Sequence, residues 1–128
     1  MVIRCVFSLA GVWLLLLACG LDPAGAGEVA RRLSEPERIA ALLEAVERSG
    51  AKFVREGKEY SGVAGRRHLE RKLRYARQRV KTAEDFIEGI ASRSSTTGRP
   101  YQVRLPGGDK IESSVWLQQR LAEIDARR

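Results

Sequence analysis

The sequence is poor in cysteine, histidine and aromatic residues. Its two cysteines, Cys5 and Cys19, both lie in an N-terminal apolar stretch, and none follows. The rest of the chain therefore has no internal disulfide and no cysteine metal site, and packing alone must stabilise it. His68 is the only histidine, and zinc sites use several His or Cys ligands, so no metal is expected. The few aromatic residues are expected in the core and at its rim.

The N-terminus has the order of a secretion signal. Met1 to Arg4 is short and positive, residues 5–19 are almost purely apolar, and small residues follow at 24–26. The apolar run of about 15 residues is shorter than the roughly 20 that a permanent membrane helix needs. An N-terminal anchor that is never cleaved is therefore the weaker alternative. We expect residues 1–26 to be a signal peptide and the protein to be exported, to the periplasm or beyond.

Two cleavage reactions fit this N-terminus. Ala24-x-Ala26 suits ordinary signal peptidase and predicts a soluble protein that starts at Gly27. The alternative is a lipoprotein signal over 1–18, because Leu-Leu-Ala-Cys at 16–19 resembles a lipobox in which Cys19 is acylated. Residues 19–33 would then be a flexible tether. Either way, residues 34–128 are expected to form a single small globular domain, in contact with the membrane only through the signal or the lipid anchor.

Acidic residues are the minority charge. The chain has 16 Asp and Glu against 23 Lys and Arg, for a net charge of +7 at pH 7. Only one residue of each sign precedes residue 27, so the excess belongs to the domain itself. A field of this sign attracts polyanions. For an exported chain these are anionic envelope lipids, glycans and acidic proteins, whereas nucleic acid is not an expected partner.

The pattern after residue 33 predicts an α+β fold that is mainly helical. A capping box at 34–37 starts the first helix, which ends at Ser49-Gly50. Further helices are expected from Ser61 to about Val80, from Thr82 through Ile90, and from about Glu112 onward. Residues 52–60 predict a β-hairpin with its turn at 56–57. Residues 100–105 predict one further short strand, at a sheet edge because it begins with proline.

Five short stretches of this domain resemble a known family. They are Phe-Val-Arg-x-Gly at 53–57, His-Leu-x-x-Lys-Leu at 68–73, Thr-Ala-Glu-Asp-Phe-Ile at 82–87, Ala-Ser-x-Ser-Ser-x-Thr-Gly-x-Pro-Tyr-x-Val at 91–103, and Glu-Ser-Ser-x-Trp-Leu at 112–117. Together and in this order they make the chain similar to the YfeK-like family of exported, periplasmic bacterial proteins, whose activity is not established. The resemblance implies export and a compact helical domain with a few short strands. It transfers no catalytic residues.

Basic residues concentrate on the second predicted helix. Eight of the sixteen residues from 66 to 81 are Lys or Arg, and Arg67, Arg71, Arg74 and Arg77 lie three or four positions apart. They therefore share one side of a helix. We interpret this side as a ridge for phosphate or carboxylate groups, which arginine binds through two hydrogen bonds. The alternative is a solvated face whose arginine stems cover apolar neighbours.

A Ser/Thr–Gly loop follows the third predicted helix. It contains Ser94, Ser95, Thr97 and Arg99, and such loops can hold an anion through backbone amides. The loop lacks the glycine spacing and lysine of a phosphate-binding loop, so no nucleotide or other cofactor is expected. The alternative is a helix-to-strand connection whose hydroxyls bind the turn backbone.

These features favour a non-enzymatic cell-envelope protein that binds an anionic partner through a basic helix face. One alternative is a protein–protein interaction module that docks through the Ser/Thr–Gly loop and its neighbouring edge strand. Another is a small hydrolase that pairs His68 with Ser94, Ser95 or Ser113. No nucleophile-elbow motif is present, which disfavours the hydrolase. We therefore predict no catalytic residues.

Overall fold

The computed structural model describes residues 31–127, which combine four α-helices with a four-stranded antiparallel sheet. This arrangement confirms the prediction of a mainly helical α+β fold. The predicted signal peptide at 1–26, Cys19 and most of the 19–33 tether lie outside the described residues. Over 31–127, no helix combines the length and the apolar character needed to cross a lipid bilayer.

The first two helices begin at serine caps. Helix α1 spans Glu35–Arg48, and the Ser34 backbone N–H donates to a Glu37 carboxylate oxygen at 2.8 Å, as the predicted capping box requires. Helix α2 spans Gly62–Ala76, and the Ser61 hydroxyl accepts from the Ala64 N–H at 3.2 Å. These caps satisfy amide groups that have no partner inside the helix.

Helix α2 is shorter than predicted, because it ends at Ala76 and a 3₁₀ turn, η1 (Arg77–Arg79), replaces its last turn. Val80 then adopts an extended conformation and packs against the core. Thr82 caps the next helix immediately, with its hydroxyl accepting from the Asp85 N–H at 3.0 Å. That helix is α3 (Ala83–Phe86), which continues without a break as the π-helical segment η2 (Ile87–Ala91).

The sheet has the strand order β2-β1-β3-β4. Its strands are β1 (Lys52–Arg55), β2 (Lys58–Tyr60), β3 (Gln102–Arg104) and β4 (Lys110–Glu112). The hairpin between β1 and β2 turns at Glu56 and Gly57, whose φ angles of 50° and 74° are the positive values that tight hairpin turns require. In this register Phe53 lies opposite both Tyr60 and Val103.

The prediction that residues 100–105 form an edge strand was wrong. Strand β3 lies inside the sheet, paired with β1 on one side and β4 on the other. Pro100 precedes the residues of β3, so its missing N–H removes no hydrogen bond from the β3 ladders. The sheet edges are β2 and β4. Strand β4 was not predicted from the sequence; it has three residues and joins helix α4 (Ser113–Ala126) directly.

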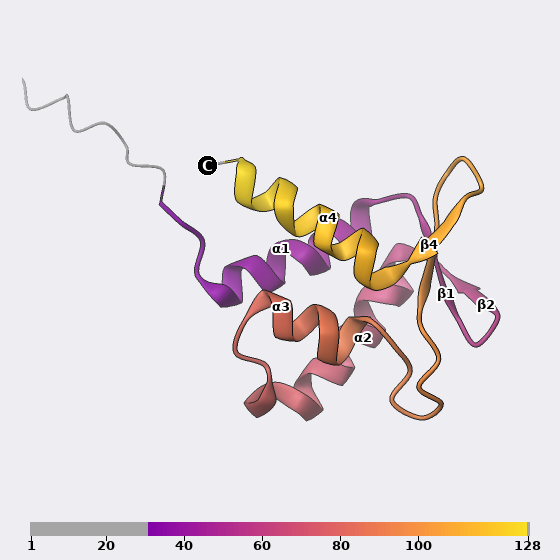
Figure 1. Ribbon diagram of the computed structural model, residues 1–128, viewed down its shortest axis with the longest axis horizontal. Helices are drawn as coiled ribbons and strands as arrows, with labels where there is room; N and C mark the ends of the chain where they lie inside the picture. Colours follow the sequence, from indigo (N-terminus) through magenta and orange to yellow (C-terminus); the bar gives the residue numbers. More distant parts are fainter. Residues whose placement is uncertain (1–30, 128) are drawn as a thin grey trace, which may run out of the picture.

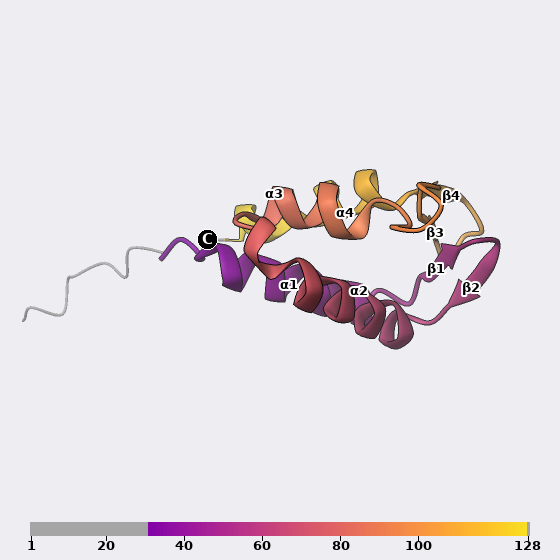
Figure 2. The same cartoon turned by 90° about the horizontal axis from the view of Figure 1, so that it is seen from below.

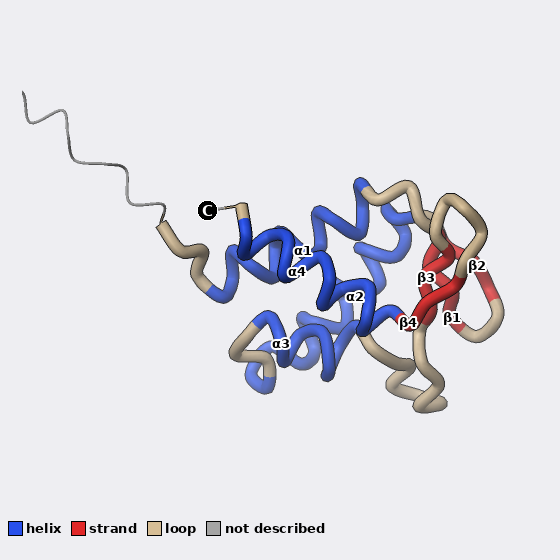
Figure 3. The backbone as a smooth tube through the Cα atoms, turned by 45° about the horizontal axis from the view of Figure 1, so that its top comes forward, coloured by secondary structure: helices blue, strands red, loops and turns tan. Residues whose placement is uncertain are grey.

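The helices form two layers over one apolar core. Figure 2 shows α1 and α2 in one layer and α3 and α4 in the other, and Figures 1 and 3 show the sheet at one end of the helices. Leu42, Val46, Phe86 and Leu117 are completely buried between the layers. The sheet joins this core where the Phe53 and Trp116 rings meet edge to face, 5.6 Å apart.

An ion-pair network ties three helices together at the opposite end. The guanidinium of Arg38 in α1 bonds Glu84 of α3 at 2.8 Å and Asp125 of α4 at 2.9 Å. Its side chain is only 12% exposed, whereas those of Glu84 and Asp125 are 55% and 32% exposed, so the guanidinium is buried beneath carboxylates that remain in contact with water. The network therefore stabilises the helix layers away from the sheet.

Candidate functional site

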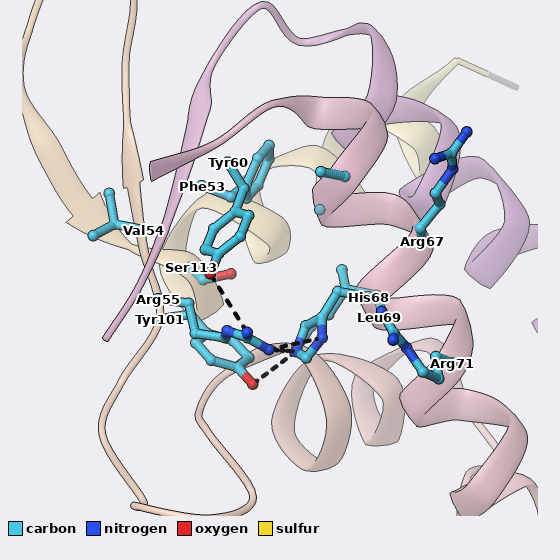
Figure 4. A pocket seen from close by; sticks show the side chains of 13 residues that line it. Phe53, Val54, Arg55, Tyr60, Arg67, His68, Leu69, Arg71, Tyr101 and Ser113 are labelled. Carbon is cyan, nitrogen blue, oxygen red and sulfur yellow. Dashed lines mark hydrogen bonds between the residues drawn. The ribbon is translucent and has the colours of Figure 1, made fainter. Parts of the chain in front are cut away.

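A pocket of about 470 Å³ lies between the β1–β2 hairpin and helix α2. One part of its lining is apolar: Phe53, Val54, Ala64, Gly65, Leu69 and Ala91. The other part is basic or hydrogen-bonding: Arg55, Tyr60, Arg67, His68, Arg71 and Tyr101. Figure 4 shows the Phe53 and Tyr60 rings across the pocket from His68. Its volume is within the range of small-molecule sites, roughly 300–1,000 Å³.

Strand and helix periodicity bring the pocket residues together. Phe53 and Arg55 are two positions apart on β1, so both side chains lie on the strand face that meets α2. His68 and Arg71 are three positions apart on α2 and lie on one side of that helix. Gly65 allows close packing, because a Cβ atom there would lie 3.2 Å from the Phe53 ring.

His68 is the centre of a hydrogen-bond cluster. An Nη of Arg55 lies 3.0 Å from His68 Nδ1, and Tyr101 Oη lies 3.1 Å from Nε2. A guanidinium only donates, so Nδ1 is the acceptor and the imidazole proton is assigned to Nε2, which donates to Tyr101. Arg55 also reaches Tyr60, with Nη2 3.5 Å from the phenol oxygen and the guanidinium over the ring. Both ring nitrogens of His68 are therefore engaged.

Lys72 contacts this cluster through Tyr101. Its ammonium donates to the carbonyl oxygens of Ile90 at 2.6 Å and Arg93 at 2.8 Å, and it lies 3.3 Å from Tyr101 Oη. The same ammonium lies 4.9 Å from the centre of the Tyr101 ring. Lys72 thus binds carbonyl groups at the end of η2, where a cation is favourable. It also fixes the Tyr101 phenol against His68.

The cluster is electrically positive. Burial, and after it the charges of Arg55, Lys72 and Arg71, together lower the pKa of His68 from 6.5 to about 4. The imidazole is therefore neutral at pH 7. Burial and Arg55 also lower the pKa of Lys72, and burial raises the pKa of the Tyr101 phenol.

No carboxylate balances the pocket cations. Within residues 31–127, Arg55, Arg67, Arg71 and Lys72 form no ion pair, whereas several other arginines, Arg38 among them, each have an acidic partner. The charge of Glu56 helps to raise the pKa of Tyr101, but the Glu56 carboxylate already contacts Thr97 and Arg99 of the neighbouring loop. Uncompensated positive charge beside a concave surface favours an anion.

The structure divides the four arginines of the predicted ridge. Arg67 and Arg71 are exposed residues that line the pocket, at its rim on α2. Arg74 and Arg77 do not line it, and they border a shallow hollow around Tyr75, whose side chain is 86% exposed. The row is broken where α2 ends, since Arg77 already belongs to the 3₁₀ turn.

The Ser/Thr–Gly loop makes contacts within the protein. The Ser94 hydroxyl accepts from the backbone N–H groups of Thr96 and Thr97, each at 3.3 Å. The Thr97 hydroxyl donates to the Glu56 carboxylate, and Arg99 lies 3.6 Å from the same group. Ser95 borders a separate hollow beside Lys72 and Tyr75. These contacts match the alternative in which the loop is a helix-to-strand connection.

Among residues 31–127, the hydrogen-bond partners of the His68 ring are Arg55 and Tyr101, and none of the three serines considered as nucleophiles. Ser113 lines the same pocket, yet its contact there is a backbone bond from its N–H to the Tyr101 carbonyl at 2.8 Å. Ser94 and Ser95 do not line the pocket. In the described part of the chain, no group of three or more His, Cys, Asp or Glu side chains is placed to hold a metal ion.

Sequence reasoning did not single out Arg55, Tyr60, Lys72 or Tyr101 as site residues. The alternation of Phe53 and Arg55 on one strand was the available signal for a shared face. Nothing in the spacing relates these residues to His68, because β1, α2 and the segment before β3 meet only in the folded chain.

Comparisons with known proteins agree on a family. A family model described as "Family of unknown function (DUF5329)" matches residues 33–125, more than half of the chain. The chain is also 43% identical over 68 residues to "Uncharacterized protein YfeK" of Salmonella typhimurium, covering 52% of this chain and 57% of that protein. It therefore spans little more than half the length of this relative. No solved structure matches. The family match confirms the resemblance to YfeK-like proteins, and the chain belongs to the DUF5329 family of unknown function.

Proposed function

We propose that this chain is an exported, non-enzymatic envelope protein that binds a small anion in the pocket between α2 and the β1–β2 hairpin. The observation that carries the proposal is the meeting of Arg55, Arg67 and Arg71 at one concave site without a carboxylate among the described residues. Guanidinium groups form strong, charge-assisted hydrogen bonds with carboxylates and phosphates. An anion would supply the missing counter-charge.

The hydrogen bonds of the cluster are suited to an anionic ligand. Arg55 donates to two neutral acceptors, His68 and Tyr60, so an anionic oxygen is a better partner for the same N–H groups. Tyr101 Oη accepts from His68 and lies next to the Lys72 ammonium. Its own proton is then free to be donated to a ligand. The partly buried position of these groups strengthens each electrostatic contact relative to water.

The test compares two arginines of the same helix. Arg71→Gln removes a charge at the pocket, and Arg74→Gln removes the same charge outside it. Binding of acetate, followed by NMR shifts of His68, should weaken up to about fivefold in the first variant, since an exposed charge at the rim contributes at most roughly 1 kcal/mol. It should be unchanged in the second. Equal losses in both variants would mean diffuse attraction by the basic surface, and absence of binding in the parent protein would reject the proposal.

Export is the second part of the proposal, and it rests on the apolar run before Cys19. The intact mass of the protein from its native envelope distinguishes a chain starting at Gly27 from one with an acylated Cys19. Native protein in the cytosol with Met1 still attached would refute export.

A further inference from the structure

We infer that the ligand of this pocket is an amphiphilic carboxylate, with its head group at Arg55 and Tyr101 and a short hydrocarbon chain against Phe53 and Leu69. The inference rests on the anion binding proposed above and names the class of anion. It follows from the division of the pocket into a charged part and an apolar part.

The charged part suits one carboxylate. Arg55 directs Nη1 and Nη2 into the cluster, 3.0 Å from His68 Nδ1 and 3.5 Å from Tyr60 Oη. Two N–H groups of one planar guanidinium match the two oxygens of a carboxylate. Arg67 and Arg71 are exposed at the rim, where they attract the anion from solution.

The apolar part of the pocket makes no favourable contacts with a small, hydrated anion. Leu69 and Ala91 are 5% and 1% exposed and belong to the protein interior, yet both line the pocket. Hydrocarbon that covers such a surface is removed from water, which is favourable in proportion to the area covered. Each methylene that enters the pocket should tighten binding about fourfold.

Packing contacts within the protein hold the apolar wall in place. The Phe53 ring is held between Gly65, whose added Cβ would lie 3.2 Å away, and Trp116, whose ring centre lies 5.6 Å away. Tyr60 lies opposite Phe53 in the strand register. A preformed wall spares the ligand the cost of ordering side chains, as in most small-molecule sites.

Three probes separate the head group from the chain. Acetate carries the head group alone, hexan-1-ol the chain alone, and hexanoate both. Titration into the purified protein, followed by calorimetry and by NMR shifts of His68, should show hexanoate binding at least tenfold more tightly than acetate if two methylenes enter. Hexan-1-ol should bind more weakly than hexanoate, because it lacks the negative charge that would pair with the Arg55 guanidinium.

A pair of variants tests where the chain lies. Ala64→Leu fills part of the apolar lining at the first turn of α2, where leucine is a good helix former. It should reduce hexanoate binding towards that of acetate and leave acetate binding unchanged. Ala40→Leu adds the same side chain at an exposed position of α1 and should change neither. Circular dichroism confirms that both variants are folded.

The outcomes distinguish this inference from the proposed function. Equal affinity for acetate and hexanoate would overturn the amphiphilic class and leave anion binding intact. Tighter binding of hexyl phosphate than of hexanoate would overturn the carboxylate head group alone. Failure of both carboxylates to bind would remove the proposed function as well.

Discussion

Anion binding to this pocket should take up a proton at His68. In the free protein, burial and the charges of Arg55, Lys72 and Arg71 lower the pKa of His68 to about 4. Burial raises the pKa of Tyr101, so its phenol adds no charge to the cluster at neutral pH, and Glu56 is engaged by the Ser/Thr–Gly loop. A bound anion offsets the part of this shift that the cations cause and so raises the pKa towards 6.5, while the part caused by burial remains. The bound state then binds more protons, so affinity rises as pH falls.

The size of this effect follows from the two pKa values. If binding restores the pKa of His68 from about 4 to 6.5, affinity at pH 5 exceeds that at pH 8 by about 30-fold. The ring is only partly buried, and solvent screening of the cations reduces the shift. We therefore expect a gain of about tenfold between pH 8 and pH 5.

Calorimetry measures this linkage directly. Hexane-1-sulfonate is a suitable probe because it stays ionised throughout the range, so any change with pH belongs to the protein. Titrations in two buffers of different ionisation enthalpy give the number of protons taken up. His68 is the only histidine, so its NMR signals report its pKa without assignment of others. A flat affinity between pH 8 and pH 5, or the same pH dependence in His68→Gln, would refute the reasoning.

Two further predictions concern the packing of the helices. Gly62→Ala should destabilise the protein by about 1–3 kcal/mol, because the added Cβ would lie 2.4 Å from the Val46 carbonyl oxygen. Gly89→Ala, with open space around the added Cβ, should instead stabilise the protein by up to about 1 kcal/mol. Urea unfolding measures both changes. Arg38→Met should cost about 1–2 kcal/mol, because it removes a buried guanidinium that bonds partly exposed carboxylates on two other helices. Arg48→Met, with one exposed ion pair, should cost less than about 0.5 kcal/mol. Equal unfolding free energies within either pair would contradict these assignments.

Local chemistry was sufficient to predict most of the elements. The Ser34 capping box, the Thr82 cap and the hairpin turn at Glu56-Gly57 all occur where the residues indicated. Each of these signals involves groups within about four positions of one another. Their effect therefore depends little on the rest of the fold.

Long-range packing decided the elements that were predicted imperfectly. Proline indicated an edge for β3, but the pairing of its other side depends on β4, which comes later in the chain. The basic run indicated a helix to about Val80, but the chain turns after Ala76 so that the apolar face of α3 and η2 can reach the core. Intrinsic helix and strand propensities predict such features poorly, because the burial of residues distant in the sequence decides them.

The sequence by itself determined the helical character of the domain, its caps and its basic charge, because these depend on residue type and short spacing. Only the tertiary structure decided which cations form a site. It placed Arg55 and Tyr101 beside His68, and it placed Arg71 at the pocket and Arg74 outside it. The physical reason is that electrostatic and hydrogen-bond interactions act over a few ångströms in space, whatever the distance along the chain.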